Sequence, residues 1–547
     1  MTATQKRTLL WLCIIGLVFF GIFIIPNLAG AKDPIMLSVF EQDEFAEYPF
    51  VLRMLTSDLS FYQTIRYFVI YLFYYYGYPF FFFSALAILP IKWIAGIDWM
   101  SQTQLIVLVL RQMINVLPGI LSVGILVYLQ TRFRSLLKSV LLFLFLLLLP
   151  PLVFNNMWWH PDGLLVFYSV LTLFFLDRDN FRFGRNFLFA AAFTGLAAST
   201  KIIGLFFFLS VGVYLIWGIV NRRISFKKAA LVGILYIVVM FVTIVISNPV
   251  LLLPIERQEV FTAYKSGFSQ LSQGFYEKST GVIRWTGFLP EIWRFYGNWI
   301  FILFVVLVAV VGAVRNKNRL INVLILCWAL VHIVYFTFFA TVMKNYYFLP
   351  AALPLFSCLG TLFDLVPGRE PAQIANGAKK RWLVNGLLIA ASILILFQSS
   401  SFIRTDVELV IYQTDREKTS ANIQFFRNLD RNYLSRIPVA EKLLIYRDWR
   451  AYVQPREHWI VEHDWNFANY AYIADLKPDL IIIEFENANY FSKSELVDNA
   501  LDFEKAQKRF VFYSDAYHEE INGYRLLHKD SFGYAFISDE FYGKYFE

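Results

Sequence analysis

Long runs of apolar residues, separated by short polar and charged segments, dominate the first 400 positions of the chain. A helix that crosses a membrane needs about 20 mostly apolar residues. The pattern therefore predicts a polytopic α-helical membrane protein with about eleven transmembrane helices. Their expected ranges are 9–26, 105–129, 137–154, 163–177, 186–200, 202–220, 229–247, 298–314, 320–340, 346–363 and 382–399.

Clusters of basic residues between these runs predict the orientation, because cytoplasmic loops are enriched in Lys and Arg. The clusters are Arg132/Arg134/Lys138, Arg178/Arg182/Arg185, Arg222/Arg223/Lys227/Lys228, Arg315/Lys317/Arg319 and Lys379/Lys380/Arg381. All five are cytoplasmic if the N-terminus is cytoplasmic, as Lys6 and Arg7 indicate, and if segment 80–94 does not cross the membrane. That segment is short and interrupted by Pro79 and Pro90, so we expect it to be juxtamembrane or re-entrant on the outer side.

Beyond residue 400 the pattern changes to charged segments that separate short apolar runs. We expect strands in "KLLIYRDW", "DLIIIEF", "RFVFYSD" and "GYAFIS", and helices in "KTSANIQFFRNLDRNYL" and "KSELVDNALDFEKAQKRF". Alternating elements over about 145 residues predict a small α/β domain. The expected organisation is a transmembrane domain over 1–399, with its first outer loop at 27–104, and an extracytoplasmic α/β domain over 400–547.

Composition agrees with a membrane protein and narrows the possible partners. Of the 547 residues, 58% are hydrophobic and only 16% are charged. The net charge of +8 comes from short clusters between apolar runs, which excludes a nucleic-acid partner. The three cysteines, Cys13, Cys327 and Cys358, lie in apolar runs and provide neither a disulfide framework nor a thiolate metal site. The last domain has no Asn-x-Ser/Thr acceptor, as is compatible with a prokaryotic plasma membrane.

The polar residues that stand out lie at the expected outer ends of the spans. The first outer loop holds the acidic stretch "SVFEQDEFAEYPF" at 38–50. The full set is Asp43, Glu44, Arg53, Arg66, His160, Asp162, Lys201, Asn248, Lys344, Tyr346 and Tyr347. These residues belong to separate loops but should lie at one depth. They predict a converging acid and base site at the outer membrane interface.

Each of these residues also has a simpler structural explanation. Asp43 is placed to cap an amphipathic helix, because apolar residues follow it at helical spacing. His160 and Asp162 follow "NNMWW", which is typical of an aromatic belt with a cap for the next span. Lys201 interrupts "LAASTKIIGLFFF", where a lysine either extends to the surface or binds a phosphate. Lys344 is equally compatible with a plain loop charge.

The order of these motifs resembles the GT-C superfamily of membrane glycosyltransferases. The branch is the one that uses polyprenyl-phosphate sugars, with protein O-mannosyltransferases and lipid A aminoarabinose transferases. The similar stretches, all within residues 1–365, are "QDEFAEYPFVLRML", "YYYGYPFFFFSALAILP", "RQMINVLPGILSVGILVYL", "HPDGLLVFYSVLTLFFL", "GLAASTKIIGLFFFLS", "SNPVLLLP" and "KNYYFLPAALPLF". One departure is that the lysine some members place before a proline pair is absent, and the sequence reads Tyr76-Gly77-Tyr78-Pro79.

The resemblance implies transfer of a monosaccharide from a polyprenyl-phosphate donor to a glycan, lipid or protein acceptor on the extracytoplasmic face, with inversion. A carboxylate that accepts the proton of the acceptor hydroxyl is needed, and Asp43 is our candidate, with Glu44 as its neighbour or orienter. The leaving lipid phosphate calls for fixed cations. The candidates are Lys201, Arg53, Arg66 and Lys344, with Tyr346 and His160 nearby and with Asp162 to hold the acceptor or organise the cations. Some relatives use a divalent metal and others do not, so no metal is assigned.

Two other classes of protein share some of these features. A transporter or lipid flippase tends to place ionisable residues near mid-membrane and to show internal repeats. Here the unusual charges cluster at outer ends and no repeat is visible. A polysaccharide polymerase or ligase also acts on polyprenyl-linked sugars, but from an oligosaccharide diphosphate rather than a monosaccharide phosphate. The Asp43 and Glu44 loop favours the monosaccharide-phosphate reaction.

Overall fold

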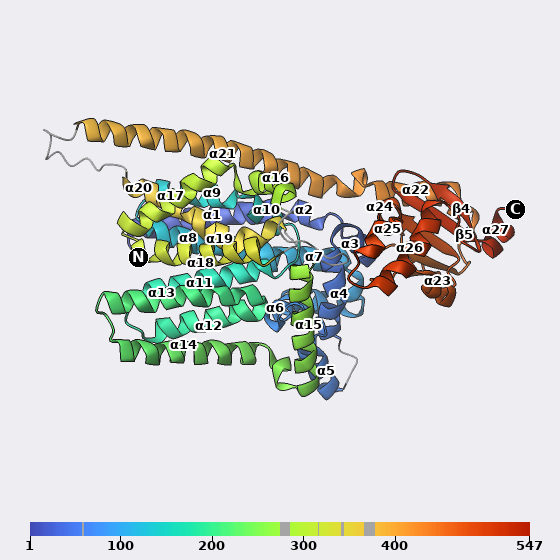
Figure 1. Cartoon of the computed structure of the whole chain (residues 1–547), viewed down its shortest axis with the longest axis horizontal. Coiled ribbons are helices and arrows are strands. Elements are labelled where there is room, and N and C mark those ends of the chain that lie inside the picture. The colour runs from blue at the N-terminus through green and yellow to red at the C-terminus, as the bar shows by residue number, and fades with distance from the viewer. Residues whose placement is uncertain (57–59, 274–284, 316, 341–343, 366–377) are drawn as a thin grey trace.

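A computed structural model describes residues 1–547 except 57–59, 274–284, 316, 341–343 and 366–377. A bundle of helices is joined at one end to a domain that contains a β-sheet (Figure 1). All eleven expected spans fall on helices. These are α1 (Ala3–Ile22), α7 to α8 (Thr103–Thr131), α9 (Leu136–Leu147) with α10 (Pro150–Asn155), α11 (Asp162–Asp179), α12 (Arg185–Thr200), η3 with α13 (Ile202–Val220), α14 (Phe226–Ser247), α17 (Trp299–Arg315), α18 (Arg319–Phe338), η5 to η6 (Asn345–Thr361) and α21 (Ala378–Thr419).

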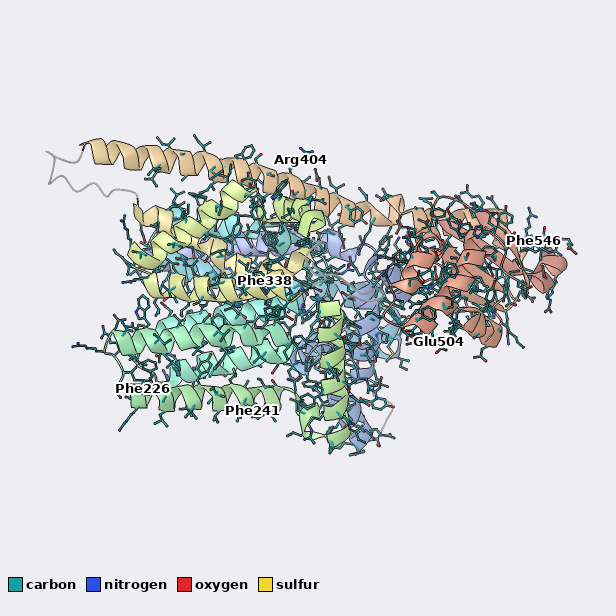
Figure 2. All side chains as sticks on the ribbon, viewed as in Figure 1. Phe226, Phe241, Phe338, Arg404, Glu504 and Phe546 are labelled. Carbon is teal, nitrogen blue, oxygen red and sulfur yellow. The ribbon has the colours of Figure 1, made fainter. Side chains whose placement is uncertain are left out.

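By length and composition, eight helices of the described chain are suited to cross a membrane, or nine if the bent pair Phe288–Tyr296 and Trp299–Arg315 is one span. Four of the expected spans are not among these eight, because α9 and α12 are short, α11 ends in charged residues and α17 is the second helix of the bent pair. The eight include one segment, Tyr78–Ser101, that was not expected to span. Large apolar side chains cover the outside of the bundle: Phe226 is 75% and Phe338 76% exposed. Figure 2 labels both, together with Phe241 on α14. Such a surface needs lipid around it, so this is a multi-pass membrane protein.

Helix α6 (Tyr78–Ala95) is the doubtful segment of the sequence. Together with the turn that follows, it also passes the length and composition criterion for a span, as Tyr78–Ser101. Its two ends, however, contact elements of the same end of the bundle. The Gly77 N–H donates to the Thr200 carbonyl oxygen (3.1 Å), and Lys92 Nζ donates to the Leu55 carbonyl oxygen (2.5 Å). Leu55 follows α4 (Gln42–Met54), which runs across that end in Figure 1. These contacts support the prediction of a juxtamembrane helix.

The basic clusters gather at the opposite end of the bundle. Arg132, just after α8, pairs with Asp177 in the last turn of α11, with Nη2 and Oδ1 2.6 Å apart. Arg132 Nη2 also donates to Asn318 Oδ1 (3.3 Å), in the turn before α18. The turns with the first, second and fourth clusters therefore meet at one end, as the positive-inside prediction requires.

The C-terminal domain is built on a five-stranded mixed sheet with strand order β2-β1-β3-β5-β4. Strands β2 and β3 pair with β1 in parallel, and β5 runs antiparallel to β3 and β4. The central strands β1, β3 and β5 bury residues on both faces of the sheet, in two separate hydrophobic clusters, whereas the edge strand β2 exposes every second residue. The strands are β1 (Leu443–Arg447), β2 (Trp459–Glu462), β3 (Leu480–Glu484), β4 (Tyr524–Lys529) and β5 (Gly533–Ser538). The predicted fold class, a helical membrane domain with a C-terminal α/β domain, is confirmed.

Three details of the sequence interpretation were wrong. The stretch "RFVFYSD" is helical, within α26 (Phe503–Tyr517), because Arg509, Phe512, Tyr513 and Ala516 form one buried helical face. Strands β2 and β4, which alternate buried with exposed positions, were missed. The boundary expected near residue 400 falls inside the continuous helix α21, which runs from the bundle to the sheet domain (Figure 1).

The topology can be tested by labelling single cysteines from outside intact cells, after replacement of Cys13, Cys327 and Cys358. Both Lys508, in the C-terminal domain, and Lys227, in the first turn of α14, are exposed. We expect an impermeant thiol reagent to label Lys508→Cys and not Lys227→Cys, because only the first is predicted to lie outside. Asp98→Cys, exposed just after α6, should also be labelled if α6 does not cross. Labelling of Lys227→Cys from outside would contradict this topology. So would failure to label Asp98→Cys from outside if the neighbouring positions were labelled only from inside.

Candidate active site

A fully buried ion pair joins the first outer loop to the second span. Glu44, in the first turn of α4, and Arg111, at the end of α7 (Thr103–Arg111), are both 0% exposed. Arg111 Nε donates to Glu44 Oε1 (2.8 Å) and Nη2 to Oε2 (2.5 Å). Arg111 Nη1 donates to the carbonyl oxygens of Asn27 (2.9 Å) and Ala29 (3.2 Å). Such a bidentate, fully bonded geometry is what a buried pair needs to offset its desolvation.

The same carboxylate fixes the loop before α11. The Trp159 N–H donates to Glu44 Oε1 (2.5 Å). Asn115 then holds His160 by both backbone groups: Asn115 Nδ2 donates to the His160 carbonyl oxygen (3.0 Å), and Asn115 Oδ1 accepts from the His160 N–H (3.2 Å). Asn115 lies in a π-helical turn, Gln112–Val116. Such turns re-aim side chains and are frequent at functional sites.

A chain of polar side chains runs from this loop to Lys201. The Tyr76 hydroxyl lies 2.9 Å from His160 Nε2 and is hydrogen bonded to it. His160 Nδ1 lies 2.9 Å from Asp162 Oδ2. Lys201 Nζ donates to Asp162 Oδ1 (2.9 Å). His160 and Asp162 are buried, while the Lys201 side chain keeps 15% exposure. Burial lowers the pKa of His160, which favours the uncharged imidazole.

Three tyrosines surround the ammonium group of Lys201. Its Nζ lies 5.5 Å from the ring centroid of Tyr347 and 5.9 Å from those of Tyr76 and Tyr346. Cation–π attraction of this kind holds a lysine head group in a partly dehydrated place. Burial, and then the charges of Asp43 and Glu47, raise the pKa of the Tyr76 hydroxyl well above its usual value. Tyr76 therefore keeps its proton and can donate it to His160 Nε2.

Close backbone packing brings Tyr76 to Lys201. A Cβ atom on Gly77 would lie 1.3 Å from the Ser199 carbonyl oxygen, so only glycine fits this contact. The next N–H, that of Tyr78, donates to Asn248 Oδ1 (2.8 Å). The first outer loop is thus fastened to the ends of α12 and α14, immediately beside Lys201.

Asp43 differs from its neighbours because its carboxylate is exposed and makes no hydrogen bond or ion pair within the described chain. The N-cap residue of α4 is Glu41, so the simple capping explanation for Asp43 does not hold. Asp43 lies within electrostatic reach of Tyr76, His160 and Tyr346. It is therefore a charged group at the open side of the cluster.

Glu47, one helical turn after Asp43, was not among the residues singled out in the sequence. It is 0% exposed, and neither carboxyl oxygen has a hydrogen-bond partner in the described part of the chain. Burial, followed by the nearby charges of Asp43 and Glu44, raises the pKa of Glu47 well above its usual value, although Lys201 opposes this. Glu47 is thus an unsatisfied carboxyl group inside the site.

The structure brings together Asp43, Lys201, His160, Asp162 and Tyr346, but not the other predicted cations. Arg53 Nη1 donates to the Ile70 carbonyl oxygen (2.7 Å), and its guanidinium stacks on Tyr67 (4.0 Å), so it stabilises the outer loop instead. Arg66 lies exposed on α5 (Phe61–Val69), at the far end of α4 in Figure 1. Lys344 precedes Tyr346 with an exposed side chain.

Sequence reasoning missed Tyr76, Glu47 and Arg111 as site residues. Tyr76 was named only in the stretch Tyr76-Gly77-Tyr78-Pro79, as part of a departure from the resembled proteins. Arg111 was noted only as the head of a span, and Glu47 only as an acidic residue of an amphipathic helix. Among the residues that the structure describes, no group of three or more His, Cys, Asp or Glu is placed to hold a metal ion. We therefore assign no metal.

The fold thus combines a helical membrane bundle, a mixed-sheet domain at one end of it and a polar site at their junction. Over 98% of both chains, the structure is similar to ArnT from Cupriavidus metallidurans bound to undecaprenyl phosphate, with 12% identity and a TM-score of 0.50. The apo form of that protein has a TM-score of 0.49 at 12% identity, over 97% of this chain and 98% of the other. An Archaeoglobus fulgidus oligosaccharyltransferase has a TM-score of 0.46 at 12% identity, over 97% of this chain and 74% of the other. No model of a protein family and no curated protein matches the sequence. At this identity the similarity establishes the fold, so function has to be argued from the site.

Removal of one partner of the Glu44 and Arg111 pair should be strongly destabilising. Arg111→Ala leaves a buried carboxylate uncompensated, and we expect a loss of about 3–5 kcal/mol in the free energy of unfolding. The double change Glu44→Gln with Arg111→Met should lose less. Thermal unfolding of purified protein in detergent measures both. Arg404→Ala, which breaks an exposed pair with Glu408 on α21, is the matched control and should cost at most about 1 kcal/mol. If Arg111→Ala lowered the free energy of unfolding by as little as Arg404→Ala does, the pair would not have this structural role.

Proposed function

We propose that the protein transfers a monosaccharide from a polyprenyl-phosphate donor to an acceptor on the extracytoplasmic face of a prokaryotic plasma membrane. The observation that carries the proposal is the placement of Asp43, whose carboxylate has no partner among the described residues, within electrostatic reach of Tyr76 and Tyr346, two of the rings that surround Lys201. The shared fold adds support, because the similar ArnT structure holds undecaprenyl phosphate. The acceptor is a glycan, a lipid or a protein that carries the hydroxyl group to be glycosylated.

Lys201 is the proposed ligand of the donor phosphate. As the bond to the sugar breaks, negative charge grows on the lipid phosphate, and fixed donors in a poorly hydrated site stabilise it. Lys201 supplies the charge, and the rings of Tyr76, Tyr346 and Tyr347 hold its ammonium group in place. The lipid tail would lie against the apolar surface of the bundle, which acyl chains solvate well.

Asp43 is the proposed general base. The acceptor hydroxyl loses its proton to the Asp43 carboxylate while its oxygen bonds to the anomeric carbon, and the bond from that carbon to the phosphate oxygen breaks. One displacement of this kind inverts the configuration of the sugar. Because Asp43 is exposed, the proton then leaves to water.

His160 and Asp162 are proposed to position Lys201 rather than to react. Asp162 is bound by Lys201 on one oxygen and lies against His160 on the other. A carboxylate held in this way fixes the cation and is poorly placed to take up an acceptor hydroxyl. Of the two roles considered for Asp162, the organisation of the cation is thus better supported.

The C-terminal domain is proposed to border the acceptor. Phe45, two residues after Asp43, has its ring 5.2 Å from that of His463 and 5.6 Å from that of Trp465. Arg450 lies 3.9 Å from Glu484, and in the favourable orientation of its amide, Gln42 accepts from Arg450 Nε at 2.5 Å. Residues on both sides of Asp43 along the chain therefore contact this domain, while Trp465 stays 44% exposed.

Asp43→Asn tests the base directly. The substitution keeps the size of the side chain but removes the proton acceptor, so we expect normal folding and a loss of roughly 10²-fold or more in turnover. The assay incubates purified protein with a panel of radiolabelled polyprenyl-phosphate monosaccharides and identifies the labelled product. Oligosaccharide-diphosphate donors in the same panel test the polymerase or ligase alternative. Asp98→Asn, an exposed aspartate of the same outer loop, is the control and should keep full activity. Near-normal turnover of a well-folded Asp43→Asn enzyme would exclude Asp43 as the base.

Trp465→Ala tests the acceptor surface. If the aromatic side chains stack on the acceptor, this change should raise the KM for acceptor several-fold and leave the KM for donor unchanged, since a lost aromatic contact costs about 0.5–1.5 kcal/mol. Phe503→Ala, an exposed aromatic residue elsewhere in the domain, should change neither. Changes at Asp464 or Glu484 that abolish turnover as fully as Asp43→Asn, with the fold intact, would instead place chemistry in this domain.

A further inference from the structure

The unsatisfied carboxyl group of Glu47 has a place in the reaction described above. We propose that Glu47 binds a hydroxyl group of the donor's sugar and holds the sugar between Asp43 and Lys201. This inference rests on the proposed function and specifies the part of the substrate that this side chain recognises.

The first argument is the burial of Glu47 without a partner. Both carboxyl oxygens are buried and unpartnered within the described chain, whereas Glu44, on the same helix, has each of its oxygens bonded. Burial of a polar group without hydrogen bonds costs about 1–3 kcal/mol. Such a cost at a candidate active site is repaid when a ligand supplies the missing partners.

The second argument is position. Asp43 and Glu47 are four residues apart on α4, so their side chains lie on one face of the helix, with Cβ atoms about 5–6 Å apart. Glu47 is also within electrostatic reach of Lys201 and Asp162. In a single displacement, the anomeric carbon lies between the attacking oxygen at the base and the leaving phosphate oxygen. The sugar must therefore bridge Asp43 and Lys201, and Glu47 is the buried polar group that is close to both.

The third argument is the state of the carboxyl group. With its pKa raised by burial and by the charge of Asp43, Glu47 carries a proton and so has one O–H donor and one accepting oxygen. That pair of groups matches a sugar hydroxyl, which also donates and accepts. An ionised carboxylate could only accept from such a hydroxyl, and its charge would repel the donor phosphate.

The experiment compares donor binding with binding of the same lipid phosphate without a sugar. We measure KM for the radiolabelled donor and the inhibition constant of undecaprenyl phosphate in wild type, Glu47→Gln, Glu47→Ala and Lys201→Met. Glutamine imitates a protonated carboxyl group, so Glu47→Gln should stay within about threefold of wild type. Glu47→Ala should raise the donor KM about tenfold or more and leave inhibition by undecaprenyl phosphate unchanged. Lys201→Met should weaken both.

Other results would overturn the inference in distinct ways. If Glu47→Gln were as inactive as Asp43→Asn, Glu47 would be acting as an anion, either as the base or as the partner of an amino group. If Glu47→Ala weakened undecaprenyl phosphate as much as donor, its role would be in the phosphate site or in the fold. Glu259→Gln, an exposed residue of α15 (Pro254–Gln273), is the control for the loss of an acidic side chain. Absence of transfer by the wild-type protein from every donor would overturn the proposed function itself.

Discussion

The buried ion pair between Glu44 and Arg111 is the constraint on which the site depends. One carboxylate binds the guanidinium of the second span and the backbone of Trp159, and the guanidinium binds the chain just after the first span. Two charges taken out of water are expensive, and the expense is offset only when all the bonds form together. The outer loop, the second span and the loop before α11 must therefore assemble in one arrangement. That arrangement leaves the adjacent Asp43 pointing to solvent rather than into the protein.

A second constraint is steric. Gly77 packs onto the carbonyl of Ser199 at a distance that no side chain permits, and Asn248 accepts from the following N–H. The end of α12, the end of α14 and the start of α6 thus meet beside Lys201. This joint holds Tyr76 beside Lys201, with its ring centroid 5.9 Å from Lys201 Nζ. Lys201 then carries the positive charge of the cluster, and its pairing with Asp162 sets where that charge lies.

The sequence predicted those features that depend on period, length and charge. Apolar runs located the helices, and the short apolar runs in "KLLIYRDW", "DLIIIEF" and "GYAFIS" located three strands of the sheet, β1, β3 and β5. Convergence of His160, Asp162 and Lys201 followed from placing the span ends at one depth. Features that depend on close packing could not be predicted from the sequence. Arg53 and Arg66 have the right charge, but only the direction of α4 and α5 across the bundle decides that they lie away from Lys201. Short runs such as "RFVFYSD" fit both periods, and tertiary packing decides between them.

The charges of the cluster cannot all be present together, and this decides which residue reacts. Asp43, Glu47 and Asp162 are three carboxyl groups near one lysine, and like charges in a buried site disfavour each other's ionised form. Asp162 is paired with Lys201 and therefore remains an anion. Glu47 is buried and has no hydrogen-bond partner within the described residues, so burial favours its protonated form. Asp43 is exposed, and water stabilises its charge without occupying its oxygens with protein donors. The environments of the three carboxyl groups therefore support the roles proposed for them: Asp43 as the base, Asp162 as the partner of the cation and Glu47 as a neutral hydrogen-bonding group.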